Sequence, residues 1–395
     1  MIKSIALLVS SITASFSLLA NTEVTGSAGG ELRYFMQDAL YEPQERTYGS
    51  VFFSPETYTE WNDGEDSLLF KPFFRADQHD EERTHFDVRE LQWMHVADTW
   101  ETKVGIGKVF WGQTESIHLV DIVNQTDAIE AVDGEDKLGQ PMVNASYFSG
   151  FGTFSVFVLP YFRERTFEST DGRLRPPVAV GEALYESDGE QSHVDYALRW
   201  QASISDWEVG LSYFSGTSRE PELVTIVNDE GQPEILPYYA QINQVGVDLL
   251  NVYGAWLLKF ESIYREGQSE DFAAVVTGFE YTTQGIFDTQ YGLGVLSEYQ
   301  FDERKDNFFA LGQNDLMVGL RFIFNDIDGT EVLMGYVQDL DESSTSSAFI
   351  EASSRISPHW RWKLDGYFFS SDDTDDTFYF LRRDDHLQFT LEYFF

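Results

Sequence analysis

The sequence contains no cysteine, and beyond its first 20 residues it has no apolar run long enough to form a transmembrane helix. Without cysteine no disulfide can cross-link the chain, which favours a large fold that closes on itself. A transmembrane helix needs about 18 consecutive apolar residues, whereas Asp248 and Asn251 interrupt even the most apolar region, 245–260. The mature chain is therefore expected to be either an exported soluble protein or a membrane β-barrel.

Basic residues and catalytic motifs are scarce as well. The 26 Lys and Arg stand against 67 Asp and Glu, and the formal net charge of −41 repels phosphates, which excludes nucleic acid as a partner. The seven His residues show no metal-binding spacing, and there is no nucleophile elbow or phosphate-binding glycine loop. Ser116 and His118 carry no supporting pattern, and the acidic cluster 372–376 fits a solvated loop tip better than a Ca²⁺ site. We therefore expect no enzyme, no cofactor and no bound metal.

The first 20 residues have the pattern of a cleaved signal peptide. Lys3 precedes an apolar stretch from Ile5 to Leu19, and the small residue Ala20 stands at the expected cleavage point. A single-span anchor is the alternative, but the stretch is short, contains several Ser and Thr, and lacks a basic flank. We expect residues 1–20 to be removed and residues 21–395 to form one domain.

The last ten residues, His386–Phe395, alternate between an apolar and a polar face. This period of two predicts a strand, and ten residues are enough to cross a bilayer at a tilt. Similar segments, separated by turn residues, recur from Thr22 onward and predict roughly 18 strands. The predicted strands are 22–36, 47–60, 66–77, 84–97, 100–112, 141–149, 152–163, 193–204, 207–216, 236–249, 252–266, 272–283, 288–302, 313–324, 331–340, 346–356, 359–371 and 386–395.

The connections between these segments alternate between long and short. The long links are 37–46, 78–83, 113–140, 164–192, 217–235, 303–312 and 372–385, with 267–271 and 341–345 intermediate. The short links are 62–65, 98–99, 150–151, 205–206, 250–251, 284–287, 325–330 and 357–358. This asymmetry is typical of bacterial outer-membrane barrels, and a soluble β-sandwich, which is the alternative, has no reason to show it.

Aromatic placement agrees with a barrel. Trp61, Trp100, Trp207 and Trp360 lie next to short links, where an interfacial girdle belongs. We therefore predict an all-β fold, a transmembrane antiparallel β-barrel of roughly 18 strands in the outer membrane of a Gram-negative cell.

Alternation also assigns charged side chains to the lumen, because a charge on the lipid face costs about 2–4 kcal/mol at the bilayer midplane. The first and last strands of a barrel are neighbours, so seven basic residues are expected on one stretch of wall: Arg33, Lys71, Arg75, Arg89, Arg355, Arg361 and Lys363. Arg89 shares parity with the apolar Leu91 and Trp93, which argues against its inward placement.

Five acidic residues are expected across the lumen from this basic ladder, with Lys259 and Arg321 as exceptions: Asp248, Glu261, Glu280, Glu298 and Glu331. A basic ladder that faces an acidic wall creates a transverse field, which selects solutes by charge and dipole. In the alternative reading, the charges merely pair with neighbours, as Arg33 with Glu31 and Lys363 with Asp365.

The connection 113–140 is long and contains an apolar stretch, 117–123. A long loop with apolar content is usually functional, so we predict that 113–140 folds into the lumen as a constriction; a helical cap over the outer mouth is the alternative. The constriction residues would be Glu115, His118, Asp121, Asn124, Asp127 and Glu130. Arg163 and Arg165 are expected at the mouth, where they would meet an anionic solute or pair with nearby acidic residues.

The segment from Lys103 to Phe167, with GKVFWG, DIVNQTD and DGEDKLGQPMVNASYF, resembles an uncharacterised family of proteobacterial, porin-like outer-membrane proteins and is distantly similar to alginate-export barrels. The match is specific over about 103–175. It implies a monomeric barrel of about 18 strands with loops folded into the lumen, but it carries no substrate over. The closing strand also resembles that of outer-membrane barrels, whose final Phe, here Phe395, belongs to the signal for the assembly machinery.

Together these patterns predict a porin-like channel that passes small polar or anionic solutes without cofactor or energy input. One alternative is a transporter of hydrophobic substrates, with Phe73, Tyr367 and Phe369 as an apolar slide. Others are a polysaccharide exporter and a structural or adhesive barrel. Besides the solute, the expected partners are outer-membrane lipid, lipopolysaccharide and the assembly machinery.

Overall fold

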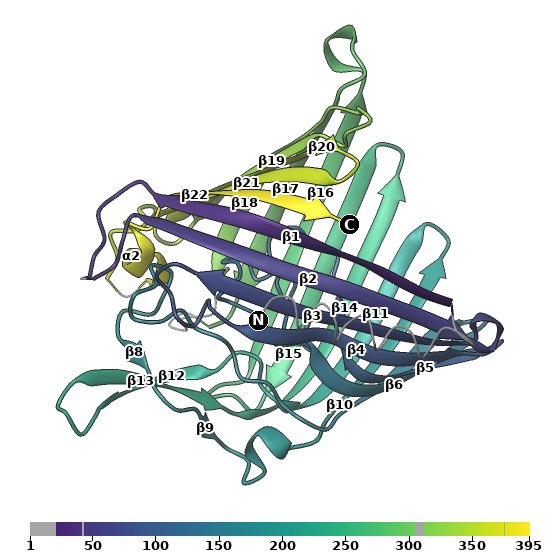
Figure 1. The fold of residues 1–395 in the computed structure, drawn as a ribbon, viewed down its shortest axis with the longest axis horizontal. Coiled ribbons are helices and arrows are strands. Elements are labelled where there is room, and N and C mark those ends of the chain that lie inside the picture. Colours follow the sequence, from purple (N-terminus) through teal and green to yellow (C-terminus); the bar gives the residue numbers. More distant parts are fainter. Residues whose placement is uncertain (1–20, 42, 305–311, 375) are drawn as a thin grey trace, which may run out of the picture.

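The computed structural model describes residues 21–41, 43–304, 312–374 and 376–395. The predicted signal peptide, residues 1–20, lies outside this part of the chain. Within it, 18 antiparallel strands form one sheet, and β1 (Asn21–Phe35) pairs with β22 (His386–Phe394). This seam closes the sheet into a barrel (Figure 1). The predicted fold class is confirmed.

The barrel strands follow one another around the wall in chain order, each antiparallel to its neighbours. Between β1 and β22 they are β2 (Thr47–Trp61), β3 (Asp66–Asp77), β4 (Phe86–Val96), β5 (Trp100–Gly107), β6 (Gln140–Ser149), β7 (Gly152–Leu159), β10 (Asp195–Ile204), β11 (Trp207–Thr217), β14 (Gln241–Tyr253), β15 (Trp256–Glu266), β16 (Phe272–Gln284), β17 (Gly292–Asp302), β18 (Asn314–Ile323), β19 (Glu331–Asp339), β20 (Ser346–Ser357) and β21 (Trp360–Ser370). Long and short connections alternate along this order, as predicted.

Four short strands outside the barrel wall escaped the sequence pattern. They are β8 (Ala179–Val180), β9 (Leu184–Tyr185), β12 (Glu222–Val227) and β13 (Pro233–Tyr239), and they form a separate sheet in two long loops. The predicted strand 236–249 ran across the boundary between β13 and β14, because the alternation of side chains continues through Ala240.

One predicted turn was wrong. The hairpin between β14 and β15 turns at Gly254 and Ala255, where Gly254 has a φ of 61°, and not at 250–251. Glycine at the first central position suits a two-residue hairpin turn. Asn251 suggested a turn in the sequence, but in the structure its side chain donates a hydrogen bond to the backbone oxygen of Asp206 in the neighbouring turn, at 2.9 Å.

The two faces of the strands separate as the alternation predicts. On β18, Val318 and Leu320 are exposed on the outer face, whereas Met317, directly before Val318, is fully buried on the inner face. Trp100, Trp207 and Trp360 are exposed at the short-turn end. The outer surface therefore carries the apolar side chains and the interfacial aromatic residues of a membrane-embedded barrel.

Helical structure is slight in the described part of the chain. It consists of the 3₁₀ turns η1 (Asn62–Gly64), η2 (Glu190–Ser192) and η3 (Ile286–Asp288) and the short helix α2 (Thr377–Leu381). The Asp376 side chain caps α2 by accepting a hydrogen bond from the Phe378 backbone N–H. No helix among the described residues is long and apolar enough to cross a membrane.

A charge on the outer face should destabilise the barrel, and a charge on the inner face should not. We expect Val318→Arg to lower the free energy of unfolding by about 2–4 kcal/mol, because the guanidinium would face hydrocarbon. Ser27→Arg, which places the same group on the water-filled inner side, is the matched control. Urea unfolding in lipid vesicles, followed by tryptophan fluorescence, measures both; equal stability of the two variants would contradict the assignment of faces.

Candidate functional site

The connection 108–139 enters the lumen directly after β5 and is bound there by two inward-facing carboxylates. Glu261 on β15 accepts hydrogen bonds from the backbone N–H groups of Gln113 (2.6 Å) and Thr114 (2.9 Å). Glu298 on β17 accepts bonds from the backbone N–H groups of Glu115 and Ser116, both at 2.8 Å. Buried carboxylates and buried backbone groups both need hydrogen-bond partners. These contacts therefore fix the first part of the connection against the wall at β15 and β17.

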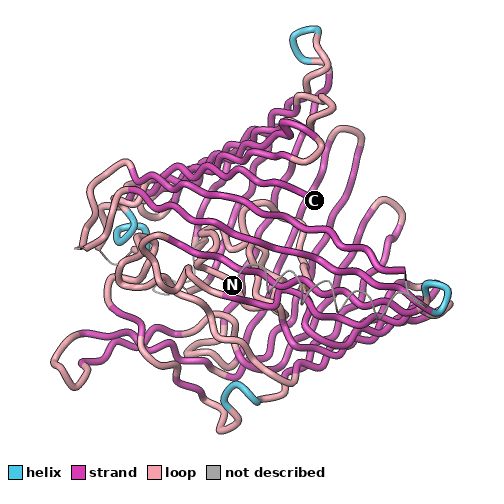
Figure 2. The backbone as a smooth tube through the Cα atoms, in the orientation of Figure 1, coloured by secondary structure: helices cyan, strands magenta, loops and turns pink. Residues whose placement is uncertain are grey.

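The apolar stretch of the connection packs against the same part of the wall. Val120, Ile122 and Val123 are almost completely buried. Their neighbours in the cluster are inward-facing side chains of β6 to β16, among them Met142, Phe157, Phe214, Ile242 and Ile263. Burial of each such side chain contributes about 1.5–3 kcal/mol, which explains why a lumen segment carries apolar residues. Figure 2 shows loop segments, in pink, lying among the strands.

The tip of the connection reaches the opposite wall, where it meets the basic ladder. Glu130 forms an ion pair with Arg75 on β3 at 2.6 Å, and Asp127 pairs with Arg89 on β4. The side chain of Arg33 on β1 approaches the backbone oxygen of Glu130 at 3.5 Å. All four paired side chains are buried. The connection therefore spans the lumen from β15 and β17 to β1, β3 and β4.

A second connection, after β7, also enters the lumen, and the sequence pattern missed this placement. Glu168 pairs with Arg33 at 3.0 Å, and Arg173 pairs with Asp384, in the loop before β22, at 2.6 Å. Phe162 in this connection is fully buried against Tyr239, with ring centroids 4.8 Å apart. The usable sequence signal was the run LPYFRERTF at 159–167, in which aromatic residues stand on both sides of three charged residues.

The two arginines expected at the mouth belong to this second connection. Arg163 forms an ion pair with Asp87 on β4 at 3.0 Å. The backbone N–H of Arg165 donates to the Tyr239 hydroxyl at 2.9 Å. Both residues therefore help to hold the connection in place.

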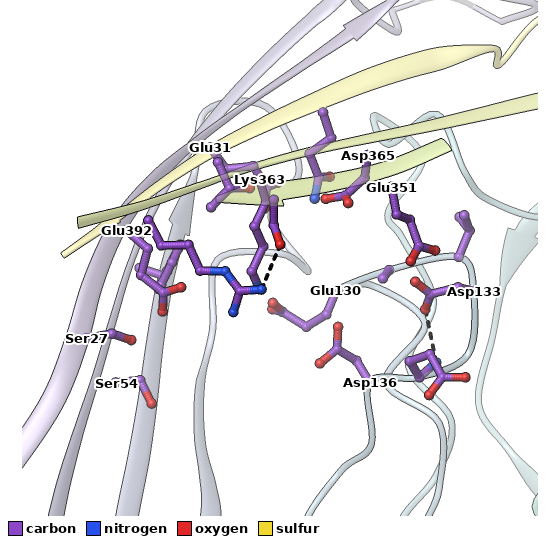
Figure 3. A pocket seen from close by; sticks show the side chains of 18 of the residues that line it. Ser27, Glu31, Ser54, Glu130, Asp133, Asp136, Glu351, Lys363, Asp365 and Glu392 are labelled. Atoms are coloured by element: carbon purple, nitrogen blue, oxygen red, sulfur yellow. Dashed lines mark hydrogen bonds between the residues drawn. The ribbon is translucent and has the colours of Figure 1, made fainter. Parts of the chain in front are cut away.

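A cavity of about 990 Å³ remains between the first connection and the wall. The wall side consists of β18–β22 and β1–β4, and the opposite side consists of the connection itself (Figure 3). The connection contributes one lysine, Lys108, and five carboxylates: Glu115, Glu130, Asp133, Glu135 and Asp136. Eleven carboxylate residues and eight Lys and Arg line the whole cavity, so the lining is charged with both signs and is not purely cationic.

Six of the seven predicted ladder residues line this cavity: Arg33, Lys71, Arg75, Arg89, Arg361 and Lys363. Arg355 does not; it is exposed, and its strand neighbour across the sheet is Arg361. Arg89 faces inward because a β-bulge inserts it between Val88 and Glu90, which pair with Pro72 and Lys71. A bulge reverses the parity of a strand, so the alternation with Leu91 and Trp93 does not hold across it.

The predicted acidic residues have other roles than facing the ladder across water. Asp248 pairs with Arg199 at 2.6 Å, and Glu280 with Arg321 at 3.3 Å. Glu261 and Glu298 bind the connection, as described above. Of the five, Glu331 lines the cavity. The carboxylates that face the ladder come mainly from the connection, because it stands between the two walls.

The predicted constriction residues divide into two groups. Glu115 and Glu130 line the cavity, and Glu115 also pairs with Arg321 at 2.8 Å. The others hold the connection in place. Asp127 pairs with Arg89 on the wall, Asp121 pairs with Lys137, and the Asn124 amide donates to the backbone oxygens of Gly107 and Leu138. The sequence pattern did not single out Lys108, Asp133, Glu135, Asp136 or Glu351 as lining residues.

His118 links the two ends of the connection after β5 to each other and to the wall. Its ring lies 2.9 Å from Glu135 and 4.0 Å from Glu261. Burial opposes a charge on the ring, but the attraction of these two carboxylates outweighs it and raises the pKa of His118 to about 10. The imidazolium is therefore charged at neutral pH and helps to bind Glu135 next to the cavity.

Three potential metal ligands, His85, Asp127 and Glu130, have ligand atoms within 4.8 Å of one another. The two carboxylates already bind the guanidinium groups of Arg89 and Arg75. Two adjacent positive charges repel a metal cation, so this group is better suited to holding the tip of the connection than to binding metal.

Comparison with known proteins places this geometry in a known architecture. A scan of protein-family models and a search of curated proteins gave no match. Among solved structures, the chain is similar to a BenF-like porin from Pseudomonas fluorescens Pf-5, with a TM-score of 0.55 and 9% identity over 95% of this chain and 98% of that one. It is also similar to OpdQ of Pseudomonas aeruginosa, with a TM-score of 0.54, 11% identity and the same coverage. The fold is that of an outer-membrane porin. At these identities only the fold is shared, so the solute of this porin-fold barrel has to be inferred from its own lumen.

Removal of the two carboxylates at the tip should release the first connection. In a variant with Asp127→Asn and Glu130→Gln, the tip loses its ion pairs with Arg75 and Arg89, whereas these arginines keep Glu31 and Asp87 as partners on the wall. We expect the tip to leave the wall, with a higher single-channel conductance and a stronger preference for anions. Glu342→Gln, in the exposed turn between β19 and β20, is the control. Unchanged conductance and selectivity in the double variant would show that the tip does not limit the passage.

Titration of Asp136 should change the ion preference of the lumen. Burial within the lumen, together with repulsion by Glu130 and Asp133, raises the pKa of Asp136 to about 6. Above this pH the cavity gains a negative charge, so the ratio of K⁺ to Cl⁻ permeability should rise between pH 5 and pH 7. Reversal potentials in a KCl gradient measure this ratio, and Asp136→Asn should flatten the rise; a wild-type ratio that falls over this range would contradict the assignment.

Proposed function

We propose that the protein is an outer-membrane channel for the passive passage of small polar solutes, including anions. The observation that carries this proposal is the charged cavity of about 990 Å³ inside a barrel whose outer face is apolar. Such a lining can form hydrogen bonds and electrostatic interactions with a solute in place of part of its hydration shell. The apolar outer face suits the bilayer. No cofactor and no catalytic step are needed for this activity.

The attraction for anions would come from the unpaired part of the basic ladder. Arg33, Arg75 and Arg89 are bound to Glu168, Glu130 and Asp127, so their charges are largely compensated. On β21, by contrast, neither Arg361 nor Lys363 forms an ion pair with any described residue, although Arg361 donates a hydrogen bond to Ser353 at 2.8 Å. Of the ladder residues that line the cavity, these two are the cations that a passing anion can reach.

The alternative of an apolar slide finds less support. The ring of Phe73 is covered by the guanidinium groups of Arg89 (4.5 Å) and Arg75 (5.7 Å). Tyr367 donates a hydrogen bond to Asp133, and Phe369 packs against Phe378 in α2. The three aromatic residues named for the slide are thus separated by polar groups. No described contact favours polysaccharide export, which the resemblance to alginate-export barrels suggested, or an adhesive role.

The proposal extends to the partners of the barrel. The backbone of Phe395 exchanges two hydrogen bonds with Gly26, and its ring stacks on Phe53 on the outer face. This terminal residue is accessible to the assembly machinery until β1 and β22 pair. Lipid and lipopolysaccharide would surround the apolar belt and the acidic loops.

Conductance of the purified barrel in planar bilayers tests the proposed function. The wild type should conduct K⁺ and Cl⁻ steadily, and a variant with Arg361→Gln and Lys363→Gln should shift the reversal potential in a salt gradient toward that of a cation-selective pore. The shift follows because the variant removes two reachable positive charges from the lining. Lys103→Gln, an inward lysine outside the cavity that pairs with Glu101, is the control. A barrel that inserts into the bilayer without conducting would refute the channel.

A further inference from the structure

The wall between β20 and β21 carries neighbouring charges of opposite sign that have no ion-pair partner. In the register of these strands Glu351 lies opposite Asp365, and Ser353 lies opposite Lys363. All four residues line the cavity. Among the described residues, the side chains of Lys363, Asp365 and Glu351 take part in no ion pair and no hydrogen bond. The pairing of Lys363 with Asp365, which belonged to the alternative reading, therefore does not occur.

These unpaired charges form a positive patch at Lys363 and a negative patch at Glu351 and Asp365, two residues apart along β21. Lys363 and Asp365 are two residues apart on the same face, which separates their Cα atoms by about 7 Å. Arg361 lies two residues before Lys363 on β21 and extends the positive patch. Asp133 of the connection lies near Glu351 and Asp365 (Figure 3). It is held there by a hydrogen bond of 2.8 Å from the Tyr367 hydroxyl.

Two carboxylates directly opposite each other on neighbouring strands destabilise a sheet, and an unpaired lysine nearby does not relieve them here. A singly charged solute would be attracted by one patch and repelled by the other. A solute with an ammonium group and a carboxylate at the matching separation would satisfy both. The two charged ends of an extended dipeptide are about 7 Å apart, since each residue spans about 3.3–3.6 Å.

We propose that this part of the cavity, formed by Glu351, Lys363 and Asp365, is a binding site for small zwitterions of dipeptide size. The solute carboxylate lies against Lys363 and Arg361, and its ammonium group lies against Glu351 and Asp365. The cavity volume of about 990 Å³ is within the range of small-molecule sites, so such a solute fits with its hydration. The inference rests on the proposed channel function and specifies its solute class.

Four probes with the same backbone and different charged ends test the site. They are glycylglycine, with both charges, glycylglycinamide, with the ammonium group alone, N-acetylglycylglycine, with the carboxylate alone, and N-acetylglycylglycinamide, with neither. The measurement is the concentration of each probe that halves the K⁺ conductance of the full-length, signal-free barrel in planar bilayers. Glycylglycine should do so at about a fivefold lower concentration than either singly charged probe, the factor expected for one more solvated ion pair.

Variants assign each end of the solute to its patch. Lys363→Gln should reduce the advantage of glycylglycine over glycylglycinamide, because the carboxylate then has only Arg361 as a partner. Asp365→Asn combined with Glu351→Gln should abolish its advantage over N-acetylglycylglycine. Lys103→Gln, the inward lysine outside the cavity, should keep the wild-type order of probes.

The K⁺ conductance separates failure of the site from failure of the channel. If the barrel conducts and the four probes act equally, or if Lys363→Gln leaves the advantage of glycylglycine intact, the zwitterion site is refuted and the channel stands. If the wild-type barrel carries no K⁺ current, the proposed function is refuted and the site falls with it.

Discussion

The requirement that every backbone N–H and C=O be paired inside a bilayer governs this structure. An open sheet would leave two unpaired edges in hydrocarbon, so β1 and β22 must join, and the register from Ser27–Phe394 to Phe35–His386 joins them. Closure in turn makes the two ends of the chain neighbours. The charged residues of β1, β3, β4 and β21 therefore gather on one stretch of wall, although more than 300 positions separate Arg33 from Lys363 in the sequence.

The same rule applied to buried charges explains how the lumen is filled. Glu261 and Glu298 face inward from β15 and β17 and would be costly if left without partners. The backbone N–H groups of the connection after β5 satisfy them, and the acidic tip of that connection compensates Arg75 and Arg89 on the opposite wall. A segment bound at both ends divides the lumen. The cavity lies on the side where the wall charges remain unpaired.

The lumen charges of this barrel thus fall into two groups, those with ion-pair partners, which hold the structure together, and those without. The ladder arginines with buried carboxylate partners fix the two inward connections and contribute little net charge to a passing solute. Lys363, Glu351 and Asp365 have no such partners and remain available to a ligand. This distinction is the basis for our proposal that β20 and β21 select the solute. It also moves the acidic face, expected on the wall opposite the ladder, to the connection after β5.

The sequence alone determined the barrel, its approximate strand number, the alternation of long and short connections and the inward parity of residues such as Arg75 and Glu298. These features follow from local periodicity, because a strand in a bilayer must place apolar residues on one face. Where local periodicity breaks, the sequence was a poor guide: the bulge at Arg89 and the turn at Gly254 depend on pairing with neighbouring strands. Only the tertiary structure decided which charges find partners and which stay free in the cavity, because an ion pair such as Arg33 with Glu168 joins residues 135 positions apart, and no local pattern encodes such a contact.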